Sequence, residues 1–187
     1  MATKIYIDQG HNPVNPNAGA EGNGLREQDV VYRIGVELAE IFRQNGYETR
    51  LSRPTPTTQL GDGTTASSLA ARVNDANSWG ANYFFSLHTN ASLVPTVSGM
   101  EGFAYSKPST AYTLGEYVLD ELSLETGLQN RGMFTRPGLY VLKKTAMPAV
   151  LLELGFITNA EDAYLLSQDP QLFALGIYNG FNNFISR

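Results

Sequence analysis

Cysteine is absent from this sequence of 187 residues, and histidine occurs only twice. The lack of cysteine excludes a disulfide framework, a zinc site with cysteine ligands and a thiol nucleophile. Any metal ion would therefore be held by histidine and carboxylate side chains. The same lack is compatible with a protein that works outside the cytoplasm.

Long apolar runs and blocks of positive charge are also missing. No stretch is long enough to span a bilayer, and residues 1–4 lead into a predicted strand without the apolar segment of a signal peptide. The formal net charge is -5, and no run of Lys or Arg is long enough to follow a phosphate backbone. We therefore expect neither nucleic acid nor a membrane as a partner.

Apolar strands alternate with amphipathic helical patterns along the chain. Strands are predicted at residues 4–8, 47–52, 83–87, 102–105, 139–142 and 149–153, helices at 25–45, 68–79, 110–126 and 170–185, and a turn at 129–132. This alternation indicates parallel strands joined by helical crossovers. The sequence therefore predicts a single α/β domain over residues 1–187, with a twisted, mostly parallel sheet flanked by helices on both faces.

Both histidines follow apolar strands. His11 comes after the strand at residues 4–8, and His88 comes directly after the strand at 83–87. Because ligands of open α/β sheets bind outside the carboxyl ends of the strands, the two side chains are expected at one edge of the sheet. A lone histidine is more often structural, but two of two at strand ends favour a shared site. Histidine together with a carboxylate suits Zn²⁺.

The third ligand of such a site is expected from an acid near His11. Glu27 stands in the first turn of the predicted helix at 25–45 and can point back towards the loop that begins with His11. An acid in a first turn also often does no more than complement the helix dipole. Glu21, in the loop itself, has almost as favourable a spacing, so the residues alone leave both acids open.

Glu153 ends the very apolar strand at 149–153. A carboxylate in this position loses solvation, so it needs a partner or holds a proton, and an active site uses either state. The structural alternative is a buried ion pair with Arg72 or Arg131. Serine nucleophile chemistry is weakly supported because the sequence has no Gly-x-Ser-x-Gly motif, and no glycine-rich phosphate loop is present.

Eight segments together resemble one known family, the type-3 zinc-dependent N-acetylmuramoyl-L-alanine amidases of bacterial autolysins, sporulation enzymes and phage endolysins. They are residues 7–11 (IDQGH), 19–20 (GA), 24–27 (GLRE), 69–72 (LAAR), 76–77 (AN), 86–91 (SLHTNA), 130–132 (NRG) and 148–159 (PAVLLELGFITN). They occur in family order and cover almost the whole chain. The sequence departs from the family at Gln9, at Asn12-Pro13 and in the Thr/Gly-rich stretch between Arg53 and Arg72.

The resemblance implies one zinc ion per chain, held by His11, Glu27 and His88, with Glu153 as the catalytic acid and base. It also implies that the enzyme hydrolyses the amide between the lactyl group of N-acetylmuramic acid and L-alanine in peptidoglycan. Because a polymer needs an open cleft, Asn90, Arg131 and the loops at 12–24 and 92–99 are the expected walls. We expect the protein to be a monomer.

Two other functions stay open from the sequence. One is a non-catalytic peptidoglycan-binding module with the same fold, and the other is a zinc carboxypeptidase. The resemblance implies action at the cell wall, outside the cytoplasm. Without a signal peptide, the protein would reach the wall by another route or after cell lysis, or the sequence would be an excised catalytic domain.

Overall fold

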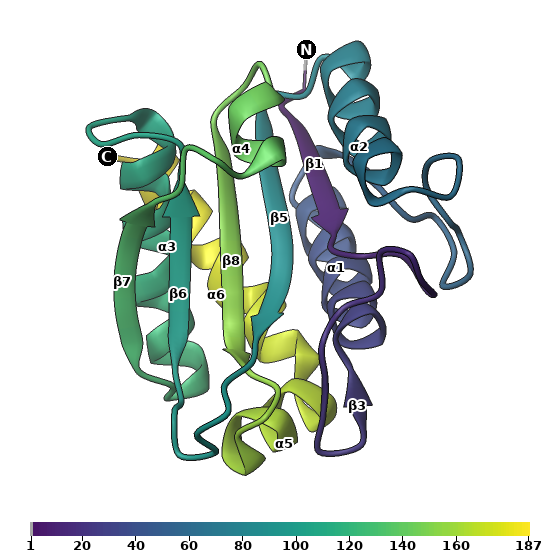
Figure 1. Cartoon of the computed structure of the whole chain (residues 1–187). Helices are drawn as coiled ribbons and strands as arrows, with labels where there is room; N and C mark the ends of the chain where they lie inside the picture. The colour runs from purple at the N-terminus through teal and green to yellow at the C-terminus, as the bar shows by residue number, and fades with distance from the viewer. Residues whose placement is uncertain (1) are drawn as a thin grey trace.

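A computed structural model describes residues 2–187 of the chain and shows one six-stranded sheet with helices on both faces (Figure 1). The strands of the sheet lie in the order β4-β1-β5-β8-β6-β7, and β6 runs antiparallel to β8 while the other neighbours are parallel. The predicted fold class, a single α/β domain with a mostly parallel sheet, is therefore confirmed.

The elements follow one another along the chain as β1 (Lys4–Gln9), β2 (Glu21–Gly22), β3 (Leu25–Arg26), α1 (Glu27–Gln44), β4 (Glu48–Leu51), α2 (Thr65–Trp79), β5 (Tyr83–Asn90), β6 (Met100–Ala104), α3 (Thr110–Thr126), β7 (Asn130–Thr135), α4 (Tyr140–Lys144), β8 (Ala149–Phe156), α5 (Ala160–Gln168) and α6 (Pro170–Ile185). None of the helices in residues 2–187 is both long and apolar enough to cross a membrane.

Alternate side chains of the central strands point to opposite faces of the sheet, as the period of a strand requires. Phe85 and Val150 pack under α1, α3 and α6, which lie behind the sheet in Figure 1. Phe84 and Leu151 point to the near face, where α2 and the short helix α4 cover them. The helix α4 has only five residues and lies near the amino-terminal end of β8 (Figure 1).

Several predicted elements match the structure, and the differences have local causes. The helices at 110–126 and 170–185 are confirmed. The first long helix begins at Glu27 instead of Leu25, because Leu25 and Arg26 pair with Glu21 and Gly22 as a small ribbon. The helix predicted from residue 68 begins at Thr65, where Thr64 and Ser67 form a capping box.

Two predictions near the carboxyl terminus are wrong. The apolar run at 139–142 forms the beginning of α4 instead of a strand, and periodicity cannot separate these alternatives over four residues. The predicted turn at 129–132 instead forms the first half of edge strand β7, where a bulge places Gly132 at a φ of 101°. Helix α5 was not predicted, although the Asn159 side chain caps it by accepting from the backbone N–H groups of Glu161 and Asp162.

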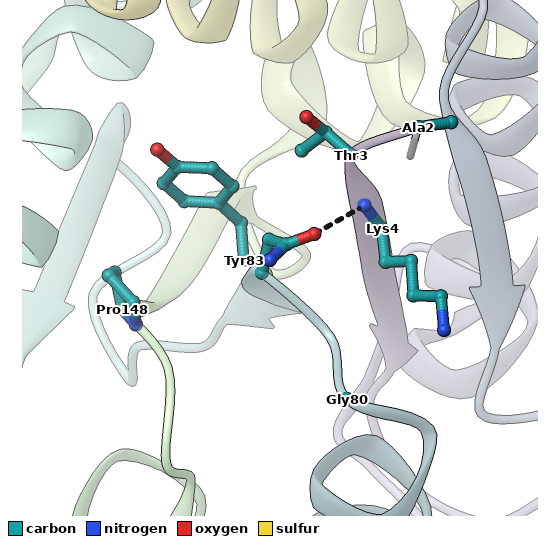
Figure 2. Close-up of a pocket in the computed structure, with 7 residues that line it drawn as sticks. Ala2, Thr3, Lys4, Gly80, Tyr83 and Pro148 are labelled. Atoms are coloured by element: carbon teal, nitrogen blue, oxygen red, sulfur yellow. Dashed lines mark hydrogen bonds between the residues drawn. The ribbon is translucent and has the colours of Figure 1, made fainter.

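A pocket of about 600 Å³ lies at the amino ends of β1 and β5, where Lys4 N donates to Asn82 Oδ1 at 2.8 Å (Figure 2). Its lining includes Ala2, Tyr83 and Pro148 but no histidine or carboxylate. The histidines lie at the opposite, carboxyl ends of the same two strands, His11 just after β1 and His88 among the last residues of β5, so this pocket is separate from the candidate site described next.

Candidate metal centre

His11, Glu27 and His88 meet at the carboxyl edge of the sheet, each carried by a different element. Glu27 Oε1 lies 3.0 Å from His11 Nε2 and 3.0 Å from His88 Nδ1, and one ligand atom from each residue lies within 4.8 Å of the others. Tetrahedral zinc with bonds of about 2.1 Å holds its ligand atoms roughly 3.4 Å apart. The three side chains therefore fit a small tetrahedral metal ion with little movement.

Arg72 binds the backbone of the turn that carries His11. His11 has a φ of 64°, a left-handed conformation that costs energy for a residue with a side chain. The buried Arg72 guanidinium donates to the carbonyls of Gln9, at 2.7 Å, and His11, and it pairs with Asp8 at 2.6 Å. Ser86 Oγ donates to the other oxygen of Asp8 at 2.7 Å. The buried ion pair thus stabilises a turn that would otherwise relax.

Two glycines allow the ligands to approach one another closely. A Cβ atom on Gly10 would lie 2.5 Å from His88 Cε1 and 2.6 Å from the carbonyl oxygen of Leu87. A Cβ atom on Gly19 would lie 2.6 Å from Glu27 Oε2 and 2.8 Å from His11 Cδ2. These distances are shorter than van der Waals contacts, so any side chain at either position would displace a ligand. Gly10 is therefore required because there is no room for a side chain at this position. The residue of the turn that has a left-handed backbone conformation is His11.

Backbone N–H groups hold the Glu27 carboxylate in place from both sides. Ala20 N donates to Oε2 at 2.9 Å, and Thr89 N donates to Oε1 at 3.0 Å. Burial alone would raise the pKa of Glu27, but hydrogen bonds from His11 and His88 outweigh it and hold the pKa below its usual value. Glu21, the other acid considered, has a side chain that is 70% exposed and lies 3.9 Å from Arg26. Of the two acids, the structure brings Glu27 to the histidines.

Glu153 lies beside the cluster on β8, in register with His88 on β5. Its Oε2 atom is buried and has no hydrogen-bond partner in residues 2–187. Burial raises the pKa of Glu153 to about 7, with the Glu27 and Glu101 carboxylates adding to the effect and His88 opposing it. Such a carboxyl group can accept and release a proton near neutral pH.

The two arginines that were considered as partners of Glu153 form ion pairs with other acids instead. Arg72 pairs with Asp8, as described above, and Arg131 Nε donates to Glu101 Oε1 at 2.8 Å. Glu101 itself is the register partner of Glu153 across β6 and β8. The Asp8–Arg72 pair and the position of Glu101 were not anticipated, although Asp8 stands at the polar end of an apolar strand, only three residues before His11.

The expected walls of the cleft lie around this edge. Asn90 ends β5, and its Oδ1 accepts from its neighbour Ala91. Arg131, on edge strand β7, also donates to the Ser98 carbonyl at 3.2 Å and so contacts the loop at 92–99. Asp162 anchors that loop by accepting from Ser98 Oγ at 2.6 Å and from Gly99 N at 3.0 Å.

The chain is similar to proteins of known family. A family model described as N-acetylmuramoyl-L-alanine amidase matches residues 5–183. N-acetylmuramoyl-L-alanine amidase CwlM of Bacillus licheniformis is 35% identical over 185 residues, which cover 95% of this chain and 66% of the relative. The chain thus spans just under two thirds of that protein.

Solved structures agree with this similarity. N-acetylmuramoyl-L-alanine amidase AmiC2 of Nostoc punctiforme superposes with a TM-score of 0.83 at 30% identity, covering 99% of this chain and 98% of the other. The CwlD amidase of Clostridioides difficile, solved in complex with the GerS lipoprotein, superposes with a TM-score of 0.87 at 25% identity and covers 98% of both chains.

Proposed function

The chain belongs to the N-acetylmuramoyl-L-alanine amidase family, and on this premise we propose that it is a zinc-dependent peptidoglycan hydrolase. The bond cut is the amide between the lactyl group of N-acetylmuramic acid and L-alanine of the stem peptide. One observation carries the proposal: His11, Glu27 and His88 converge within ligand distance beside Glu153, whose buried Oε2 atom has no hydrogen-bond partner within the described residues. Residues 1–187 would form the catalytic domain, and one zinc ion would be bound per chain.

His11 Nε2, Glu27 Oε1 and His88 Nδ1 would hold the zinc ion. When bound, zinc supplies a Lewis acid that polarises the scissile carbonyl and acidifies a water molecule. Arg72 keeps the His11 turn in its left-handed conformation, and the N–H groups of Ala20 and Thr89 fix the Glu27 carboxylate. Such supporting contacts preserve the ligand geometry in the absence of substrate.

Glu153 moves the proton in the proposed reaction. As general base, its carboxylate accepts a proton from the water that attacks the lactyl carbonyl carbon. As general acid, it then donates this proton to the alanine nitrogen when the C–N bond breaks, so the products are a lactyl carboxylate and a free α-amino group. The pKa of about 7 and the unpartnered Oε2 atom support this role.

Asn90 and Arg131 would contact the substrate from the walls of the cleft. The Arg131 side chain pairs with Glu101 and is 36% exposed, so a substrate in the cleft can reach it. It can therefore bind a carboxylate of the stem peptide. We expect the domain to act as a monomer at the cell wall, with peptidoglycan as its partner and with neither nucleic acid nor a membrane bound.

The reaction is tested by incubating the zinc-loaded protein with purified cell walls and assaying the newly freed amino groups. An amidase frees the α-amino group of L-alanine. A zinc carboxypeptidase would instead release free carboxyl-terminal amino acids, and a non-catalytic binding module would sediment with the walls and release nothing. Either of these last results would overturn the proposal.

Glu153→Gln tests the proton transfer. Because the amide matches the carboxyl group in shape but cannot accept the proton, we expect the fold and the bound zinc to remain while hydrolysis falls by 10²-fold or more, as is typical of a lost general base. Glu37→Gln, at an exposed position of α1 outside the loops named as cleft walls, is the matched control and should retain full activity. Near-normal hydrolysis by Glu153→Gln would reject the catalytic role.

A further inference from the structure

A second cavity, of about 140 Å³, opens beside the candidate metal centre on the face of the sheet covered by α2 and α4. We call it the α2–α4 pocket. The metal-site histidines form part of its wall, and apolar side chains from three elements form much of the rest; the residues are His11, His88, Leu69, Leu139, Val141 and Leu151. A molecule held at the metal centre therefore has immediate access to this pocket.

The register of the sheet places the pocket relative to the reacting groups. Leu151 pairs with Ser86, whereas Glu153 pairs with His88 two residues further along the same strands. Side chains two residues apart point to the same face and lie roughly 7 Å apart. The pocket wall at Leu151 thus lies only two residues along β8 from Glu153, so the pocket is within reach of a substituent a few bonds from the scissile carbonyl.

The lining selects a neutral, apolar occupant. The two charged residues of the wall, Asp8 and Arg72, lie 2.6 Å apart and neutralise each other. Two polar residues are satisfied internally, since Asn17 Nδ2 donates to Ser68 Oγ and Thr65 Oγ1 donates to the Pro16 carbonyl. A charged group entering the pocket would lose its hydration without gaining a counter-charge.

The volume limits the size of the occupant. An apolar cavity of about 150 Å³ holds one benzene molecule. The α2–α4 pocket therefore accepts a short aliphatic group and excludes a sugar ring with its substituents. In the proposed substrate, two groups of this kind flank the cleaved amide, namely the methyl of the alanine and the methyl of the lactyl group.

We propose that the α2–α4 pocket binds the small alkyl group next to the scissile amide and so sets the specificity of the enzyme for that group. The inference rests on the proposed function, because it takes the amide to be bound at the metal centre. Since one methyl group fills only part of the pocket, the protein should tolerate, and even prefer, a somewhat larger aliphatic group at this position.

Alkyl hydroxamates test the pocket without requiring hydrolysis. The hydroxamate group binds zinc, so acetohydroxamate, propanohydroxamate and butanohydroxamate place chains of increasing length beside the metal centre of the zinc-loaded protein. Burying each methylene should tighten binding by roughly fourfold, as measured by calorimetry. Equal dissociation constants along the series would overturn the inference.

Substitutions that fill the pocket test whether the increase in hydroxamate affinity with chain length arises there. Val141→Phe fills it, so we expect the affinity gain along the hydroxamate series to disappear while acetohydroxamate still binds. Val36→Phe makes the same change at an exposed position of α1 and should keep the gain. Leu139→Phe, at a half-buried position just before α4, fills the pocket from its rim and is the second variant if Val141→Phe does not fold. A gain that persists in both folded filling variants would contradict the proposal.

The two possible sources of the methyl group are separated with synthetic muramyl peptides. One analogue carries glycine in place of alanine, and the other carries a glycolyl group in place of the lactyl group. The analogue that lacks the bound methyl should lose roughly fourfold in kcat/KM, and Val141→Phe should abolish this difference. If affinity rises along the hydroxamate series but the protein does not hydrolyse peptidoglycan, only the proposed reaction is overturned. If the protein hydrolyses peptidoglycan but the hydroxamates all bind equally, only the proposed role of the pocket is overturned.

Discussion

Removing the Arg72 guanidinium tests whether the buried ion pair supports the metal centre. In Arg72→Met, a side chain of similar length replaces the arginine, but Asp8 keeps a charge in a site where both partners are only 1–2% exposed. Breaking a buried pair by removing one partner costs about 3–5 kcal/mol. For a domain of this size, that corresponds to a fall of roughly 6–20 °C in Tm.

Urea unfolding of the metal-free protein, kept so with a chelator, measures this loss separately from zinc binding. Arg50→Met is the matched control, because Arg50 pairs with Asp75 at a similar distance of 2.8 Å while both side chains are more than 40% exposed. An exposed pair contributes about 0–1 kcal/mol. A loss below about 1 kcal/mol in Arg72→Met, equal to that of the control, would refute the argument.

Two further measurements connect the pair to the site. Adding Asp8→Asn to Arg72→Met removes the uncompensated carboxylate, so the double variant should regain about 1–3 kcal/mol of the lost stability. Because Arg72 also donates to the His11 carbonyl, zinc affinity should fall in both variants. The stability that Asp8→Asn restores to the fold should not restore this zinc affinity. Unchanged zinc affinity would show that the turn does not depend on Arg72.

The remaining predictions concern the ligands and acid stability. His88→Ala should remove stoichiometric zinc, as metal analysis of the purified variant would show; a full zinc content would exclude His88 as a ligand. Gly10→Ala should keep the fold but weaken zinc binding at least tenfold, because the added Cβ lies 2.5 Å from His88 Cε1; retained affinity would mean that the ring can move freely. Burial alone would raise the pKa of Asp8, but Arg72 and Ser86 lower it below its usual value, so its contribution to stability is present above pH ~4 and lost as the pH falls through the lowered folded pKa. Asp8→Asn should reduce this loss of stability at acidic pH, as measured by unfolding the metal-free protein over a range of pH. An unchanged pH dependence would show that Asp8 is not its source.

Much of the fold was predictable because strands and long amphipathic helices are local patterns. The helices at 110–126 and 170–185 carry apolar residues at helical spacing and begin or end at clear capping signals, such as Gly127 with its φ of 73°. The segment at 139–142 was misassigned because four apolar residues are too few to define a period. Its helical state depends on packing, since Val141 and Leu142 are buried against α2 and the near face of the sheet.

The sequence by itself determined the chemistry that this protein offers: two histidines and one glutamate at the ends of apolar strands, with no cysteine to compete as a ligand. The tertiary structure decided which acid joins them and which acid stays unpaired. Glu27, instead of Glu21, reaches the histidines from the first turn of α1, and Arg72 and Arg131 pair with Asp8 and Glu101 instead of Glu153. These partners lie 16 to 77 residues apart in the sequence, so only the register of the folded sheet and the packing of its helices bring them together.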